Sequence, residues 1–355
     1  MNATRNGAQA ATNGDPGPSS TRGKPIYEGS TQFRNWRFSP ERLAHTRARL
    51  NAGAVDAIRV AFETDEPGSS SRVQFLTADE ELLLVKLYAS KIPQMCQLFR
   101  FPEEVEATAI TYLKRFYLKN TVMDWHPKNV MLTALFLATK TTNNPISIEH
   151  YTKVIPRVEV SDVLDIEFLV AQSLGFEFSV WHAHRALWGI WLDLQTVPDA
   201  PPPDHNIYQK ALSHVAQSRL TDAELIYTPS QIAHACLSLA APNLAEQWLE
   251  AKFPSTSPEK AASATMLRDV IATLRALITT EGQAPPIEAV REVDRRLRLC
   301  KNPEKIPGTK AYLARKAEEE RKAEEKRQRK LKAATMGSDP FGETLVEEGL
   351  DDDDD

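Results

Sequence analysis

The sequence contains few cysteines, and none of them has the spacing of a disulfide framework or a zinc site. Cys96, Cys236 and Cys300 lie far apart, and no CxxC pair or Cys/His cluster occurs. Disulfide-stapled folds and structural zinc sites both need denser cysteines than this. We therefore expect three buried or incidental thiols in a reducing compartment, with no bound metal and no cofactor.

Long hydrophobic runs are absent too. The longest one lies near residues 130–138, far short of the roughly 20 residues that a transmembrane helix requires. The N-terminal stretch MNATRNGAQAATNGDPGPSS contains no apolar segment and does not have the pattern of a signal peptide. These absences predict an intracellular, soluble protein that makes no membrane contact.

Catalytic motifs are missing as well. The sequence has no GxGxxG or GxxxxGK[ST] phosphate loop, no HExxH helix and no GxSxG turn. Its eight histidines are scattered, and His182 and His184 are expected on different faces of a helix. Because no carboxylate pair is singled out either, the sequence favours a binding protein over an enzyme.

Helix start signals are abundant, whereas strand patterns are not. Ser39 and Pro40 predict the start of a helix that runs toward residue 62. Two capping boxes begin at Thr77 and Thr228, with Glu80 and Gln231 at their third helical positions. A proline at position 93 predicts a kink or a break in the first of these helices. The sequence therefore predicts an all-α fold.

The helices form two similar sets of five. In the first set, the helix at 127–140 is apolar nearly all round, which is typical of a helix surrounded by others. A shift of 102 residues superposes it on the helix after Thr228, so that Pro127 meets Pro229 and Lys140 meets Pro242. The helix opened at Thr77 is predicted to run through Ile92 up to the kink or break at Pro93. The remaining helices are predicted at 103–120, 147–154, 160–174, 182–195, 205–219, 243–252 and 262–279.

These patterns divide the chain into six segments. We predict a disordered stretch at 1–30, an N-terminal helix and linker at 31–76, a first helical repeat at 77–180, a second at 181–281, a C-terminal helix at 282–308 and a charged tail at 309–355. Residues 310–332 have the composition of a solvated helix or a disordered arm, and the chain ends in the acidic run VEEGLDDDDD. The basic run at 326–332, KRQRKLK, is either a nuclear localisation signal or a solvated charged helix.

Two consecutive five-helix repeats with a buried third helix resemble the cyclin family. The stretch ALFLATK is similar to the cyclin-box segment that ends in a lysine, and VLDIEFLVAQSLGFEF is similar to the fifth box helix with its glutamate. Across residues 31–300 the resemblance narrows to the H-type cyclins, through TQFRNWRFSPERLAHTRARL, KRFYLKNTVMDWHPKNVMLT and LTDAELIYTPSQIA. The fold that this implies is two tandem five-helix cyclin folds with extra terminal helices and disordered tails.

The resemblance also implies a kinase-binding site. It assigns the lysine and glutamate of the family's kinase grip to Lys140 and Glu167, and the apolar contacts around them to Leu137, Phe176 and Phe178. A solvated lysine at a helix end and an exposed glutamate are the alternatives for the pair, and core packing is the alternative for the apolar three. Because Pro242 replaces the lysine in the second repeat, kinase binding is expected mainly in the first.

By resemblance, the protein is a nuclear, non-catalytic subunit that activates a cyclin-dependent kinase. The partners implied are the catalytic subunit of the CDK-activating kinase, a ménage-à-trois-type assembly subunit and the core of transcription factor IIH, with roles in transcription by RNA polymerase II and in the cell cycle. The substrate-docking MRAIL-type motif and a destruction box are both absent. Another transcriptional cyclin, of the C or K type, is an alternative.

A second alternative is a protein like transcription factor IIB, which binds promoter DNA with two cyclin folds. DNA binding needs a basic face, but residues 77–280 contain 17 Lys and Arg against 22 Asp and Glu. The whole chain has a formal net charge of -5. We therefore expect no direct contact with nucleic acid.

Overall fold

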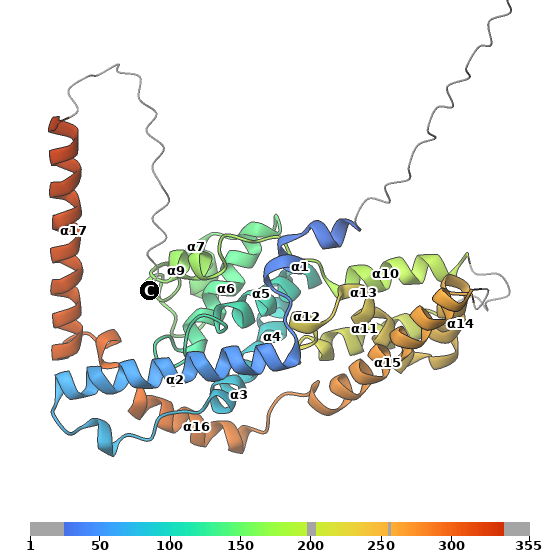
Figure 1. Cartoon of the computed structure of the whole chain (residues 1–355), viewed down its shortest axis with the longest axis horizontal. Coiled ribbons are helices and arrows are strands. Elements are labelled where there is room, and N and C mark those ends of the chain that lie inside the picture. Colours follow the sequence, from blue (N-terminus) through green and yellow to red (C-terminus); the bar gives the residue numbers. More distant parts are fainter. Residues whose placement is uncertain (1–24, 197–203, 255–256, 337–355) are drawn as a thin grey trace, which may run out of the picture. The chain divides into compact units, whose positions relative to one another are not determined.

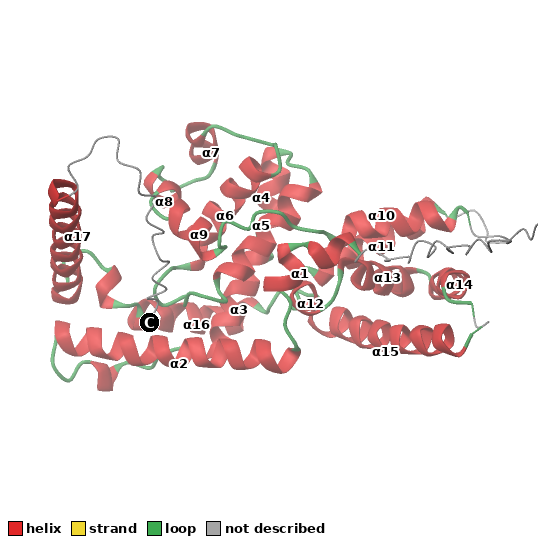
Figure 2. Cartoon of the chain, turned by 45° about the horizontal axis from the view of Figure 1, so that its top comes forward, coloured by secondary structure: helices red, strands yellow, loops and turns green. Residues whose placement is uncertain are grey.

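The computed structural model describes residues 25–196, 204–254 and 257–336. Every helix in these ranges is an α-helix or a 3-10 helix, and the ranges contain no β-strand (Figures 1 and 2). The prediction of an all-α protein is therefore confirmed. Among the same residues, no helix is both long enough and apolar enough to cross a membrane.

The chain forms two compact units. Among the described residues, the first, the α2–α9 unit, contains 39–176, 216–221 and 277–336. Its larger helices begin with α2 (Pro40–Asp65) and continue with α3 (Ala78–Ala89), α4 (Ile92–Phe99), α5 (Glu103–Phe116), α6 (Pro127–Thr141), α7 (Ile148–Val154), α8 (Ser161–Leu164) and α9 (Glu167–Ser173). The short 3-10 helix η2 (Ser70–Arg72) lies in the loop after α2.

The predicted start signals operate as the sequence suggests. The Ser39 hydroxyl accepts a hydrogen bond from the backbone N–H of Arg42, which caps α2. Thr77 and Glu80 form both hydrogen bonds of a capping box at the start of α3. The chain breaks between α3 and α4, where Pro93 takes the second helical position and needs no N–H partner.

Helix α6 is the centre of its unit. It packs against α3, α5, α8 and α9, and it is buried from Val130 to Thr139. A helix that is covered on all sides must be apolar all round, which is why the stretch VMLTALFLAT carries almost no charge. The prediction of a buried central helix is confirmed, and Lys140, close to the C-terminal end of α6, is the residue of this helix that is most open to solvent.

Two helices of this repeat depart from the prediction. The helix expected at 103–120 ends at Phe116. The single helix expected at 160–174 is broken into α8 and α9. The break follows from a side-chain contact: Thr133 of α6 donates its hydroxyl to the carbonyl of Val163 at 3.1 Å. In an unbroken helix that carbonyl would accept the N–H of Glu167, so Glu167 becomes the first residue of a new helix.

The second unit, the α10–α15 unit, contains the described residues within 25–38, 177–215 and 222–276. Its helices are α1 (Thr31–Asn35), α10 (Ala183–Leu194), most of α11 (His205–Ser218), α12 (Ala223–Ile226), α13 (Pro229–Ala240), α14 (Pro242–Lys252) and most of α15 (Pro258–Glu281). Helix α13 is buried along most of its length and packs on α10, α12 and α14. The capping box at Thr228 is present. The prediction did not include α12, and it started α15 four residues late.

The ends of the chain differ partly from expectation. Residues 25–30 contain a 3-10 helix, η1 (Ile26–Gly29), where disorder was predicted. The rest of that prediction, residues 1–24, lies outside the described residues, as does the acidic end from residue 337. Helix α16 (Ile287–Cys300) matches its prediction. After η3 (Pro303–Lys305) comes α17 (Lys310–Met336), which contacts its unit only near its start (Figure 1).

Candidate functional site

The predicted pair of charged residues meets where α6 ends and α9 begins, within the α2–α9 unit. Lys140 lies in the last turn of α6, and Glu167 opens α9. The Lys140 ammonium donates to Glu167 Oε1 at 2.6 Å. Each charge suits its helix dipole, since a cation is favoured at a C-terminus and a carboxylate at an N-terminus. The pair is therefore held in position by the helices that carry it.

Solvent still reaches this ion pair. The Lys140 side chain is 43% exposed and that of Glu167 is 21% exposed. The ammonium also lies 4.3 Å from the ring centroid of Phe136, which fixes the lysine by a cation–π contact. A lysine has three donors, and these two contacts leave capacity for a further acceptor from outside the chain. The arrangement can offer a fixed, oriented charge to a partner's backbone carbonyl.

Two exposed aromatic rings lie close to Glu167 in sequence. Phe168 is 70% exposed and Phe176 is 53% exposed, and their ring centroids are 6.0 Å apart. Phe176 follows Gly175 at the C-terminal end of α9, and both residues have positive φ. This left-handed turn holds the Phe176 ring next to Phe168. Large aromatic side chains in solvent are typical of interaction surfaces. We name Lys140, Glu167, Phe168 and Phe176 the α9 surface.

The structure treats the other two predicted site residues differently. Leu137 is only 6% exposed and belongs to the core around α6. Phe178 is half-buried and lies in the α10–α15 unit, two residues beyond the boundary. The structure brings together Lys140, Glu167 and Phe176 in one unit, whereas Leu137 supports that surface from below. The assignment of all five residues to kinase binding remains a prediction.

Sequence reasoning missed Phe168 and the exposed apolar residues of α8. Val160 and Leu164, at 38% and 39%, are exposed hydrophobic residues like Phe168. The sequence signal for them is that residues 160–174 contain apolar side chains on every face of the expected helix. A single amphipathic surface helix would have polar residues on its solvent side. To assign these extra apolar residues to the surface, one would have to know that the helix is broken between α8 and α9.

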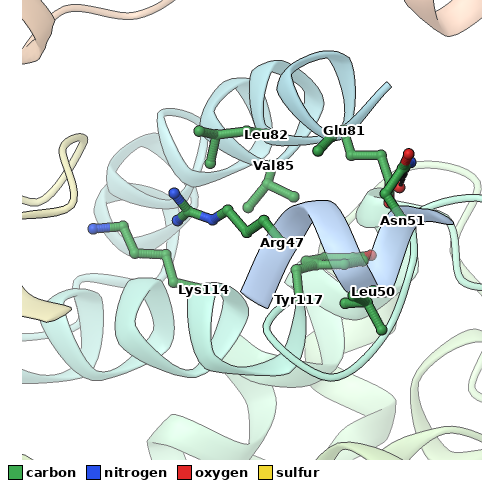
Figure 3. Close-up of a pocket in the computed structure, with 9 residues that line it drawn as sticks. Arg47, Leu50, Asn51, Glu81, Leu82, Val85, Lys114 and Tyr117 are labelled. Atoms are coloured by element: carbon green, nitrogen blue, oxygen red, sulfur yellow. Dashed lines mark hydrogen bonds between the residues drawn. The ribbon is translucent and has the colours of Figure 1, made fainter. Parts of the chain in front are cut away.

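A small pocket at α2, α3 and α5 is a competing candidate. Figure 3 shows Arg47 of α2 reaching between α3 and α5 toward Lys114, with Glu81 and Asn51 at the other end. The cavity measures about 30 Å³, which is room for one water and not for a metabolite. The Lys114 ammonium donates to the carbonyl of Thr221 at 2.6 Å. This pocket is therefore a packing feature.

Glu81, at the rim of that pocket, is a buried structural carboxylate. It accepts hydrogen bonds from Asn51 Nδ2 at 2.6 Å, and from Thr121 Oγ1 and the backbone N–H of Val122 at 2.8 Å each. Burial raises the pKa of Glu81 above its ordinary value, although those three donors act in the opposite direction. The carboxylate ties α2 to α3 and to the loop after α5, and it has no substrate-sized space in front of it.

The histidine prediction was wrong in its geometry. His182 precedes α10 in an extended conformation, so the spacing rule for a helix does not apply to it. The rings of His182 and His184 stack, with centroids 5.2 Å apart. No group of three or more possible metal ligands occurs in the parts of the chain that the structure describes.

Family comparisons agree with the two helical repeats. The family model of the cyclin N-terminal domain matches residues 84–179. The model of the cyclin C-terminal domain matches residues 182–279. Together with the buried α6 and α13 and the lysine–glutamate pair between α6 and α9, these matches define the class of protein as a cyclin.

Full-length relatives narrow the class further. The cyclin mcs2 of Schizosaccharomyces pombe is 31% identical over 329 residues, which cover 89% of this chain and 98% of mcs2. Cyclin-H1-1 of Arabidopsis thaliana is 29% identical over 301 residues, which cover 77% and 88% of the two chains. The chain therefore belongs to the cyclin family, and within it to the cyclin H group.

Solved structures show the same similarity. One chain of the CAK complex of Chaetomium thermophilum bound to ATP-γ-S is 28% identical, with a TM-score of 0.71, over 90% of this chain and 98% of that one. One chain of the yeast TFIIK complex (Kin28/Ccl1/Tfb3) is 30% identical, with a TM-score of 0.58, over 71% of this chain and 100% of that one. Both relatives are subunits of multiprotein complexes.

Proposed function

We propose that this chain is the regulatory subunit of a CDK-activating kinase, and that it binds the kinase catalytic subunit through the α9 surface. The observation that carries the proposal is the exposed Lys140–Glu167 ion pair, with exposed Phe168 and Phe176 beside it. The solved relatives come from a CAK complex and from the TFIIK complex of three named chains. Their setting supports a kinase and an assembly subunit of the ménage-à-trois type as partners.

The geometry suits an interface of mixed character. Aromatic rings supply most of the buried area and binding energy at such surfaces. A paired charge at the centre sets the partner's orientation more than its affinity. Here Glu167 holds Lys140 at 2.6 Å, so the ammonium is already placed before the partner arrives. Because the lysine side chain is already ordered, less side-chain entropy is lost when the partner binds.

Activation follows from selective binding to one conformation of the kinase. Phosphoryl transfer requires a lysine–glutamate pair inside the kinase, which depends on the position of one kinase helix. A cyclin that binds only the competent position shifts the kinase population toward it. The chain contributes no group to the chemistry, so its role is regulatory and non-enzymatic.

Location and wider role follow from the same assignment. A subunit of the TFIIK type acts on transcription by RNA polymerase II as part of transcription factor IIH, and its working compartment is the nucleus. The basic run at 326–332 lies on the exposed part of α17, where an import receptor could reach it. A DNA-binding role like that of transcription factor IIB is not favoured by any feature of the described residues.

The test is co-expression of the full chain with the catalytic subunit of its own organism's CDK-activating kinase, with and without the assembly subunit. Complex formation and phosphorylation of a kinase activation loop are measured for wild type and for Lys140→Ala/Glu167→Ala. We expect the double variant to remain folded and to lose activation by at least about tenfold.

A matched control comes from the second unit. Lys252 and Asp193 form a similarly exposed pair at 2.7 Å, with side chains 41% and 32% exposed. Lys252→Ala should leave complex formation and kinase activity unchanged. If Lys252→Ala and the double variant reduce activity equally, the α9 surface is not the kinase-binding site. A wild-type chain that neither binds nor activates the kinase rejects the function as a whole.

A further inference from the structure

Helix α17 has two halves with different charge balance. Residues 310–325 contain five cations and five acids, and several of these neutralise one another, as Arg321 does with Glu318 at 2.6 Å. The run at 326–332 contains five cations and no acid. Four of these cations, which we name the α17 basic surface, form no ion pair with any residue that the structure describes: Lys326, Arg327, Arg329 and Lys330.

The α17 basic surface lies on one side of its helix and is open to solvent. All four of its residues are exposed. At roughly 3.6 residues per turn, their directions fall within about 160° of the helix circumference. Lys326 and Lys330 lie one turn apart, where like charges repel each other. A chain of negative charges along this side relieves the repulsion, so the surface fits an extended acidic ligand.

The chain itself carries a segment of opposite charge. Residues 343–355, ETLVEEGLDDDDD, contain eight Asp and Glu and no Lys or Arg. We name them the acidic segment. The five consecutive Asp residues at 351–355 form the only run of more than three acids in the whole sequence. The acidic segment is therefore the best electrostatic match to the α17 basic surface that the chain contains.

The acidic segment is close enough in the chain to reach this surface. The run at 326–332 lies four to ten residues before Met336, where α17 ends, which is about 6–15 Å along the helix axis. Residues 337–342 span up to about 20 Å, so they allow the chain to reverse and bring residue 343 beside the run. Residues 343–355 extend up to about 43 Å, which is longer than the run. The segment can therefore contact every cation of the surface.

We propose that the acidic segment folds back along α17 of its own chain and masks the α17 basic surface. The contact is intramolecular, so the segment acts at an effective concentration on the order of millimolar, and weak exposed charge pairs suffice to hold it. Salt screens such pairs and releases the segment. An import receptor, or any other acidic partner of the basic run, then binds only in competition with the segment. Neither set of residues belongs to the α9 surface, so the mask does not depend on kinase binding.

Zero-length cross-linking of the full chain tests this contact. A carbodiimide joins a carboxylate to an amine only where the two groups touch, and peptide mass mapping identifies the residues joined. We expect amide bonds from Lys326 or Lys330 to the acids of 343–355 at about 0.02 M salt, and loss of most of them at about 0.5 M. In a mixture of isotopically labelled and unlabelled chains, each bond should join residues of one chain.

Matched substitutions separate docking from simple closeness in the chain. Arg327→Gln/Arg329→Gln removes two cations of the surface but neither reactive lysine, and it should reduce the cross-link yield by at least about threefold. The control Arg49→Gln/Arg291→Gln removes the same charge from exposed positions of α2 and α16 and should leave the yield unchanged. Circular dichroism verifies that every variant is folded.

A labelled peptide of residues 343–355 shows whether the surface is already occupied. In the full chain with Asn at all five positions 351–355, the mask is weakened, so the peptide should bind at least about tenfold more tightly than to wild type. Fluorescence anisotropy at about 0.02 M salt measures both affinities. Arg327→Gln/Arg329→Gln, added to the Asn variant, should remove this gain.

Four outcomes overturn the proposal. Equal peptide affinity for wild type and the Asn variant means that the acidic segment does not occupy the surface. Cross-links that are absent, or equal in the Arg327→Gln/Arg329→Gln variant and wild type, mean that the cations do not hold the segment. Equal loss of yield in the Arg49→Gln/Arg291→Gln control means that net charge alone is responsible. Cross-links between labelled and unlabelled chains mean that the segment docks on a second copy.

Discussion

At the scale of single residues, the charge of Lys140 has to be separated from its contact with Glu167. The exchange Lys140→Glu/Glu167→Lys preserves an ion pair between α6 and α9 but reverses the charges that a partner meets. The exchanged pair keeps the attraction of about 0.5 kcal/mol, but each charge now opposes its helix dipole at a cost of about 0.3–1 kcal/mol, so the melting temperature should fall by only a few degrees. Kinase activation should still be lost, because the partner carbonyl of the proposed contact would then face a carboxylate.

Activity restored by the exchange would contradict this. It would mean that the pair serves only to join α6 to α9. Thermal unfolding and the activation-loop phosphorylation assay, run on the same preparations, distinguish the two results.

Phe168 and Leu137 illustrate how burial separates binding from stability. Phe168 is 70% exposed, so Phe168→Ala should leave the unfolding free energy almost unchanged but reduce kinase affinity by about tenfold or more. Leu137 is 6% exposed, so Leu137→Ala should cost about 2–5 kcal/mol of stability through lost packing. Urea unfolding and an affinity titration measure the two effects. A strongly destabilised Phe168→Ala would show that its ring packs against the core.

Glu81 gives a prediction about pH. Its folded-state pKa is raised by burial, so its contribution favours folding below the ordinary glutamate value of 4.5 and is lost as pH rises through the raised value. Glu81→Gln keeps a carbonyl acceptor without a charge. The difference in unfolding free energy, Glu81→Gln minus wild type, should therefore increase as pH rises from the acid range and then level off.

Glu41 provides the control of opposite sign. Its own backbone N–H and the Ser39 hydroxyl lower the pKa of the Glu41 carboxyl, so its contribution is present above the ordinary value and is lost as pH falls. The difference in unfolding free energy between Glu41→Gln and wild type, variant minus wild type, should therefore decrease as pH rises. A flat profile for Glu81→Gln in urea unfolding across this range would mean that burial has no net effect on its ionisation.

At the scale of elements, helix capping is the feature that links sequence and structure most directly. Thr77 forms a complete capping box at the start of α3, and Thr77→Ala should cost about 1 kcal/mol. Thr64→Ala is a matched control, because the Thr64 hydroxyl bonds only within α2, to the carbonyl of Val60. Chemical denaturation measures both. Equal costs for the two substitutions would mean that the box adds nothing to the stability of α3.

The same signals explain which parts of the fold could be predicted. Capping residues, prolines and the apolar texture of α6 are local, so the starts of α2, α3, α6 and α13 could be predicted from a few neighbouring residues. The α8–α9 break could not, because it depends on a bond from Thr133 to a carbonyl 30 residues away. The stacking of His182 on His184 was missed for a similar reason, since His182 lies before the helix and not in it.

The candidate site divides along the same line. Lys140 and Glu167 were predicted from a family pattern, and their 2.6 Å contact agrees with it. Leu137 could not be assigned to core or surface from sequence, because apolar residues occupy both. The exposure of Phe168 follows from where α9 begins, which itself follows from the break. Whether these two residues are buried or exposed thus depends on contacts between distant parts of the chain, which local sequence patterns do not show.

At the scale of the whole molecule, activation by conformational selection has a thermodynamic consequence. Suppose that the chain binds the nucleotide-competent kinase conformation more tightly. The chain then increases the kinase's affinity for nucleotide by a certain factor, and nucleotide must increase the kinase's affinity for the chain by the same factor. Couplings of this kind are typically about 5- to 150-fold. Calorimetric titration of kinase with chain, with and without ATP-γ-S, and of kinase with ATP-γ-S, with and without chain, measures both factors.

The two factors must agree for wild type and fall together for variants of the α9 surface. Lys140→Ala should reduce them equally if, as proposed, the lysine contacts only the kinase conformation that the nucleotide also favours. Lys252→Ala, in the other unit, should change neither factor. A chain that binds the kinase tightly yet leaves nucleotide affinity unchanged, with a coupling factor near one, would be a scaffold and not an activator, since a ligand that binds both conformations equally shifts no population.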